Sequence, residues 1–198
     1  MIKIGLTGGI GAGKSTVSEY LRNRGYIVLD ADAIGRDLTK KGGEAIPFIT
    51  EHFGDDMIKA DGNLNRKKLA DIVYNDKEKL ALYESATTLK IVETILSDMS
   101  WYEDCDTLIF AEVPLLFEKN MNKEMDFNWV VVSDDEDRIK RVIDRDKISE
   151  KLIKDIIKNQ MDQDVKMKLS DEVIDNSSDA KFLYEQIDKL LEKYQQKV

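Results

Sequence analysis

A glycine-rich string near the start of the chain restricts its fold and chemistry more than any other feature. The string reads Gly8-Gly9-Ile10-Gly11-Ala12-Gly13-Lys14-Ser15 and matches the pattern G-x-x-x-x-G-K-[ST] in full. Glycines let the backbone wrap closely around phosphate oxygens, with N–H groups pointing inward where a Cβ atom would push the oxygens away. In such a loop the lysine bridges the β- and γ-phosphates of a nucleotide, and the serine hydroxyl coordinates Mg²⁺. The string therefore predicts a phosphate-binding loop (P-loop).

The segments around this loop have the pattern of an α/β protein. Five short apolar runs are predicted as buried strands, and they cover residues 2–6, 26–29, 107–113, 128–132 and 172–174. The first run leads directly into the glycine string, and Val17, Tyr20 and Leu21 follow it at helical spacing. Apolar runs that alternate with longer helical periods are typical of βαβ units. The sequence thus predicts helices packed on a parallel sheet.

Two segments are longer or more charged than a simple crossover requires. The stretch between the second and third predicted strands contains Asn65 as a predicted cap for a helix with Leu69, Ile72 and Val73 on one face. After the fourth strand comes a highly charged segment, residues 134–163, in which Ser149 is predicted to cap a helix. We therefore predict one domain over residues 1–198, with a helical insertion at about 31–105 and a lid at about 134–163.

Composition excludes several classes of protein. Acidic residues outnumber basic ones by 39 to 30, a net charge of −9, which argues against general nucleic-acid binding. The single cysteine, Cys105, excludes an internal disulfide framework, and the single histidine, His52, argues against a His-rich zinc site. The chain shows neither a targeting segment at its start nor an apolar run of about 18 residues, the length that spans a bilayer. By elimination, we expect a cytoplasmic protein without membrane contact.

Among P-loop proteins, the remaining pattern favours a small-molecule kinase. A regulatory GTPase needs the guanine-reading pattern N-K-x-D, and the nearest string, residues 122–125, lacks the aspartate. Two acids, Asp30 and Asp32, follow the second predicted strand, where the carboxyl ends of parallel strands border the ligand crevice. If extended, these acids point to opposite sides. We favour Asp32 as the general base or orienter of the acceptor hydroxyl, whereas Asp30 equally well caps the next helix.

An ordered series of strings resembles the dephospho-coenzyme A kinase family. The matching strings are Leu6–Thr16, Asp30–Asp32 with Arg36, His52–Gly54, Asp61–Arg66, Val113–Glu118, Arg141 with Arg145–Asp146, Gln160 and Val173–Asn176. They cover about residues 4–176 in order. The resemblance implies a P-loop NTPase fold of the α/β class, with a five-stranded parallel sheet core flanked by helices, a helical acceptor-binding insertion and a lid.

The resemblance also implies roles for single residues. The expected ATP-binding residues are Gly8, Gly9, Gly11, Ala12, Gly13, Lys14, Ser15 and Thr16. Arg141 and Arg145 are expected to neutralise charge on the moving phosphoryl group together with Lys14, and Arg36 and Arg66 to bind the acceptor with Asp32. Glu112 lies where a third-strand acid holds Mg²⁺ through water, and an ordinary polar strand end explains it equally well. With Ser15 it completes the expected metal residues.

The expected reaction is transfer of the γ-phosphoryl group of Mg·ATP to the 3′-hydroxyl of dephospho-CoA, the final step of CoA biosynthesis. Another nucleotide or small-metabolite kinase, or a nucleotide-dependent switch that transfers nothing, are the alternatives. Two departures from the family pattern stand out. Thr87-Thr88 replaces a usual His-Pro in the insertion, and Arg138 stands where the family often has glutamine.

Overall fold

The computed structural model describes residues 1–73 and 75–198, which form two compact units. The first combines Met1–Asp30 with Met99–Val198, and the second is Ala31–Asp98. The first carries the glycine-rich loop and is called the core unit below. The second is called the insertion unit. It ends at Asp98, whereas the sequence placed the end of the insertion at about residue 105.

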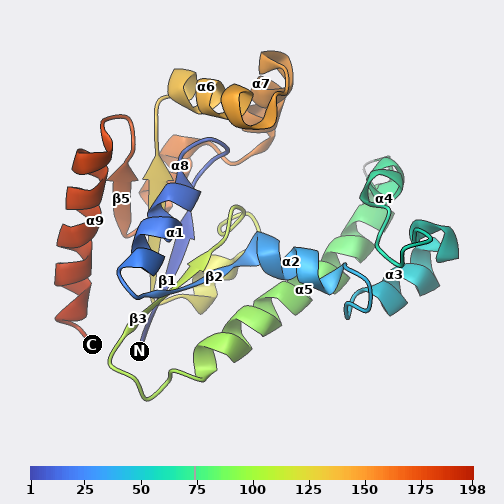
Figure 1. The fold of residues 1–198 in the computed structure, drawn as a ribbon, viewed down its shortest axis with the longest axis horizontal. Coiled ribbons are helices and arrows are strands. Elements are labelled where there is room, and N and C mark those ends of the chain that lie inside the picture. The colour runs from blue at the N-terminus through green and yellow to red at the C-terminus, as the bar shows by residue number, and fades with distance from the viewer. Residues whose placement is uncertain (74) are drawn as a thin grey trace. The chain divides into compact units, whose positions relative to one another are not determined.

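The core unit is built on a parallel sheet of five strands in the order β2-β3-β1-β4-β5 (Figure 1). The strands are β1 (Ile2–Thr7), β2 (Ile27–Asp30), β3 (Leu108–Glu112), β4 (Phe127–Val132) and β5 (Glu172–Asp175). All five predicted strands are confirmed, each to within one residue at either end. β1 lies at the centre, paired with β3 and β4, so the loop that follows it emerges at the middle of the carboxyl edge.

Two helices of the core unit, α1 (Lys14–Asn23) and α9 (Ala180–Gln195), share one apolar core with the sheet (Figure 1). Alternate residues of β1, namely Ile2, Ile4 and Leu6, belong to this core because successive strand residues face opposite sides. The predicted apolar stripe of the last helix is confirmed: its members Leu183, Ile187, Leu191 and Tyr194 are buried, and Leu190 packs against them. α1 and α9 also meet directly, since the rings of Tyr20 and Tyr184 stack with centroids 4.2 Å apart.

The charged segment of the core unit forms a pair of packed helices. These are α6 (Asp135–Asp146) and α7 (Glu150–Asn159), followed by α8 (Gln163–Leu169), which packs against β4. The predicted cap is confirmed, because the Ser149 hydroxyl accepts a hydrogen bond from the Leu152 amide. A short 3₁₀ turn, η2 (Met121–Glu124), precedes β4.

The insertion unit has a small apolar core of its own. Its elements are α2 (Ala31–Leu38), α3 (Ile46–Phe53), η1 (Asp55–Met57), α4 (Arg66–Val73) and α5 (Lys77–Ser100), whose last residues belong to the core unit. The core residues are Leu38, Ala45, Ile49, Met57, Leu64, Leu69 and Val73. Asn65 caps α4 as predicted, accepting a hydrogen bond from the Lys68 amide at 3.2 Å.

The departure Thr87-Thr88 lies within α5, which runs without a break. The Thr87 hydroxyl donates to the Tyr83 carbonyl at 2.9 Å, one turn earlier. This bond satisfies the polar side chain within the helix. Across residues 1–73 and 75–198, no helix has both the length and the apolar character that crossing a membrane requires.

Candidate active site

The phosphate loop lies between β1 and α1, and its backbone conformation depends on glycine. Gly11 and Gly13 have φ angles of 74° and 99°, in the left-handed region that residues with a Cβ rarely adopt. Close neighbours add a second reason. A Cβ on Gly11 would lie 2.5 Å from the Arg138 carbonyl oxygen, and one on Gly13 would lie 2.0 Å from the Asn176 amide nitrogen. The loop is therefore packed tightly on its outer side by other segments.

The polar side chains of the motif lie at the loop and at the start of the helix that follows it. The Lys14 ammonium donates to the carbonyl oxygens of Gly8 and Gly9, at 2.8 and 3.4 Å, and so lies across the first half of the loop. Ser15 and Thr16 are exposed in the first turn of α1. The amide groups of this first turn carry the positive end of the helix dipole, which attracts phosphate.

Three side chains from the far end of the chain hold the backbone of the loop. The Ile10 amide donates to the Gln160 side-chain oxygen at 2.9 Å, and the Ile10 carbonyl accepts from Arg138 Nε at 3.0 Å. The Ala12 carbonyl accepts from the Asn176 amide at 2.9 Å. Sequence reasoning missed these contacts. Gln160 and Asn176 were present in the matched strings and Arg138 stood out as a departure, but no local pattern shows which backbone group a side chain reaches.

The two predicted lid arginines have different surroundings. Arg141 is half-buried and donates to the Asn176 carbonyl at 2.8 Å, to the Ser133 hydroxyl at 3.1 Å and to the Gly11 carbonyl at 3.5 Å. Arg145 is exposed and forms a two-point ion pair with Asp146, at 2.8 and 2.7 Å. The hydrogen bond from Arg145 holds the pKa of the Asp146 carboxyl below its usual value. The structure thus brings Arg141, but not the ion-paired head of Arg145, into hydrogen bonding with the loop.

The carboxylates predicted near the strand ends lie on different kinds of element. Asp30 is the last residue of β2 and pairs in register with Glu112, the last residue of β3. The two acids are therefore neighbours at the carboxyl edge of the sheet. α2 begins directly at Ala31, so Asp32 lies in its first helical turn and is exposed. The condition of an extended Asp30–Asp32 segment is not met, because the helix starts directly after the strand.

The insertion unit contains a hollow of about 620 Å³ with many cationic side chains. Its basic lining residues are Arg36, Lys40, Lys59, Arg66 and Lys67. One wall is fixed, because Arg66 donates to the Thr39 hydroxyl at 2.5 Å and Thr39 is buried. Both arginines that the family pattern assigns to the acceptor thus line one hollow, which sequence reasoning alone could not place.

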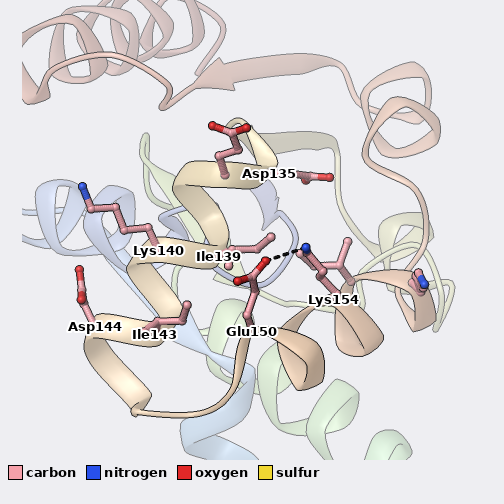
Figure 2. Close-up of a pocket in the computed structure, with 10 residues that line it drawn as sticks. Asp135, Ile139, Lys140, Ile143, Asp144, Glu150 and Lys154 are labelled. Atoms are coloured by element: carbon pink, nitrogen blue, oxygen red, sulfur yellow. Dashed lines mark ion pairs between the residues drawn. The ribbon is translucent and has the colours of Figure 1, made fainter.

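Two hollows of the core unit lie beside the charged helical segment. One, of about 660 Å³, lies between α6 and α7 and includes no residue of the phosphate loop. Figure 2 shows Ile139 and Ile143 on the side of α6 that faces Glu150, which pairs with Lys154 at 2.6 Å. The other, of about 410 Å³, includes Gly9 and the buried side chain of Lys166. Of these two hollows, the second borders the phosphate loop.

The geometry and the comparisons first define a class. A P-loop after the central strand of a five-stranded parallel sheet is the architecture of P-loop kinases, and shikimate kinase from Acinetobacter baumannii shares the fold, with a TM-score of 0.56 at 19% identity. The dephospho-CoA kinase family model matches residues 2–181. The chain belongs to the dephospho-CoA kinase family.

Individual relatives agree with this assignment over almost the whole chain. A dephospho-CoA kinase from Fusobacterium nucleatum is 38% identical, with 96% of each chain covered. One from Carboxydothermus hydrogenoformans is 38% identical over 98% of this chain and 95% of its own. Among solved structures, a Thermus thermophilus protein has a TM-score of 0.82 at 30% identity, covering 97% of both chains. Dephospho-CoA kinase from Campylobacter jejuni has a TM-score of 0.72 at 26% identity, covering 97% of this chain and 98% of its own.

Proposed function

We propose that this chain transfers the γ-phosphoryl group of ATP to the 3′-hydroxyl of dephospho-CoA, giving CoA and ADP. One observation carries the proposal: a complete phosphate loop, fixed by side chains of the core unit, in a chain that matches dephospho-CoA kinases over 96% of its length. The substrates are water-soluble small molecules, so the proposed reaction belongs in the cytoplasm and needs neither nucleic acid nor a membrane.

The nucleotide side of the reaction is assigned to the core unit. Amide groups from Gly11 to Thr16 bind the phosphates, with Gly8 and Gly9 forming the entrance to the loop. The glycine conformations and the Lys14 ammonium at the loop fit a polyphosphate. Mg²⁺, when bound, neutralises charge on the β- and γ-phosphates, and the Ser15 hydroxyl and the Glu112 carboxylate are the groups proposed to hold it.

The acceptor side is assigned to the insertion unit. Dephospho-CoA carries a diphosphate, and the hollow lined by Arg36 and Arg66 supplies cationic groups for an anion in a chain whose net charge is −9. Asp32 accepts the proton of the 3′-hydroxyl or orients that hydroxyl for attack. Its exposed position in the first turn of α2 leaves the carboxylate accessible to an acceptor.

Phosphoryl transfer asks mainly for positioning and charge neutralisation. Lys14, Arg141 and Arg145 are proposed to balance the charge that spreads over the moving group. Arg141 already bonds the loop, whereas Arg145 has to leave or share its Asp146 partner to reach a phosphate. Arg145 therefore acts in the transfer step rather than in holding the loop.

A panel of acceptors tests the function. Purified protein with Mg·ATP should convert dephospho-CoA to CoA, measured by mass spectrometry of the products, with AMP and shikimate turned over much more slowly. Comparable or faster phosphorylation of AMP would show another small-molecule kinase. ADP release that is indifferent to dephospho-CoA would show a nucleotide-dependent switch.

A further inference from the structure

We propose that Arg138 and Gln160 are positioning residues that together clamp Ile10 and set the phosphate loop in its binding conformation before the nucleotide arrives. Both polar backbone groups of this one residue are held by side chains: the amide by Gln160 at 2.9 Å and the carbonyl by Arg138 at 3.0 Å. The proposal rests on the nucleotide chemistry proposed for the loop and adds a role that the P-loop pattern does not contain.

The burial of Arg138 shows that it is a fixed part of this arrangement. Its side chain is 5% exposed and pairs with Asp135, one turn earlier in α6, at 2.7 Å. A guanidinium is rarely buried unless its donors are satisfied by geometry that holds it in place. The fit to the loop is also close, since a Cβ on Gly9 would lie 2.3 Å from a terminal nitrogen of Arg138. The Arg138 side chain therefore fits against the loop only because residue 9 has no side chain.

The position of the clamp within the loop explains how it acts. Ile10 immediately precedes Gly11–Thr16, the stretch proposed to bind phosphate through its amides. These two side chains hold the residue before that stretch. Within the stretch, Asn176 and Arg141 bond the carbonyl oxygens of Ala12 and Gly11 rather than amide groups. Ordering a backbone residue costs conformational entropy, and a loop that is already ordered avoids that cost on binding. The clamp therefore raises nucleotide affinity without contact with the nucleotide.

The two clamp residues come from opposite ends of the charged helical pair. Arg138 lies in the first turns of α6, and Gln160 is the residue that ends α7. A displacement of this helical pair therefore changes both contacts to Ile10 at once. Since a ligand shifts an equilibrium toward the state that it binds better, nucleotide binding and the placement of α6 and α7 favour each other.

The test compares ADP binding and turnover in Arg138→Met and Gln160→Leu. Each substitution removes one hydrogen bond to Ile10, and the loss of one such bond corresponds to about a 5- to 10-fold change in affinity. We expect the Kd for ADP and the KM for ATP to rise by that factor, while kcat at saturation stays within about two-fold. The double variant should lose less than the product of the single losses, because both residues act on the same peptide unit.

Hydrogen exchange at the Ile10 amide separates this role from general stabilisation. Exchange should accelerate in Gln160→Leu, and Gln160→Glu, which keeps an acceptor oxygen, should restore protection. Lys140→Met, an exposed site on the same helix, is the matched control and should leave ADP affinity unchanged. The proposal is overturned if both clamp variants bind ADP within two-fold of the parent, or if Ile10 exchange does not respond to Gln160→Leu. ADP binding needs no acceptor. The binding results therefore test the clamp even if the chain does not phosphorylate dephospho-CoA.

Discussion

The phosphate loop and the cation-lined hollow of the insertion unit hold their functional groups in contrasting ways. Around the loop, the backbone of Ile10 and Ala12 is bonded to side chains more than a hundred positions away, and the Arg138 side chain among them is 5% exposed. In the hollow, Arg36, Lys40 and Arg66 are exposed, and the Lys40 ammonium pairs locally with Asp37. The loop is set by directional contacts that include a buried arginine, whereas the hollow presents charge to solvent, with Arg66 anchored to the buried Thr39 hydroxyl.

This difference teaches that the two substrates are recognised by different physical means. Buried hydrogen bonds fix geometry and respond little to salt, so the nucleotide should meet a preset site. Exposed charges attract anions through water and are screened by ions over about 10 Å at 0.1 M salt. Acceptor binding should therefore depend on salt more steeply than nucleotide binding does.

The largest effect is expected at Arg145, an exposed arginine of the core unit. Arg145→Ala should lower kcat and kcat/KM about equally, by about 10³-fold or more, because a transition-state arginine contributes that much. The Kd for ADP should stay near the parent value, since Arg145 bonds Asp146 rather than the loop. Steady-state kinetics with calorimetric ADP binding measures both quantities.

The matched substitution for Arg145 is Arg145→Lys. It keeps the charge but loses the two-point geometry, and it should recover only part of the activity. A nearly normal kcat in Arg145→Ala would show that this residue is a solvated surface charge. The assignment of Arg145 to the transfer step, in contrast to Arg141 at the loop, would then be wrong.

The next effect concerns Asp32, at the start of the insertion unit. Asp32→Asn keeps the shape and removes the charge, and turnover should fall by about 10²- to 10⁴-fold if this carboxylate handles the acceptor hydroxyl. ADP affinity and melting temperature should stay close to the parent, because Asp32 is exposed and a charge in the first helical turn contributes only about 0.3–1 kcal/mol. Kinetics, calorimetry and thermal melting test the three expectations.

The control for Asp32 is Asp30→Asn. Asp30 ends β2 beside Glu112, so its loss should disturb the strand edge more than the acceptor and should reduce activity less. An inactive Asp30→Asn beside an active Asp32→Asn would move the catalytic assignment to Asp30. Activity in both would mean that no carboxylate in this segment is required.

The smallest effect is expected at Arg66 in the cation-lined hollow. Arg66→Met should raise the KM for dephospho-CoA by about 10-fold, in the range of a charged hydrogen bond, and leave the KM for ATP unchanged. In the parent protein, the acceptor KM should rise with added salt more steeply than the ATP KM. Equal salt dependence of the two KM values would remove the distinction between the regions.

Local patterns predicted much of this fold because they act over a few residues. Short apolar runs such as the one at Trp129–Val132 need cover on both faces, and this requirement places them in the sheet. Asn65 and Ser149 marked helix starts because their side chains satisfy amide groups of the first turn. The glycine string predicted the unusual backbone at Gly11 and Gly13 because glycine, without a Cβ, readily adopts positive φ angles.

The features that the sequence did not predict depend on contacts between residues far apart in the chain. Arg138 reaches the Ile10 carbonyl from 128 positions away, and neither residue carries a local signature of that bond. Glu112 and Asp30 become neighbours only through strand order and register. The start of α2 directly at Ala31 likewise sets the relation of Asp30 to Asp32, and the relation expected for an extended segment does not apply.

The bond between Asn176 and the Ala12 carbonyl has a consequence for synthesis of the chain. The two residues are 164 positions apart, so at about 5–20 residues per second a ribosome needs roughly 10 to 30 s to make the second after the first. Over most of that interval the glycine loop exists without Arg138 and Gln160, and over all of it without Asn176. The segment that is translated first is therefore completed last, and the nascent chain gains its nucleotide site only when β5 and the turn after it have left the ribosome.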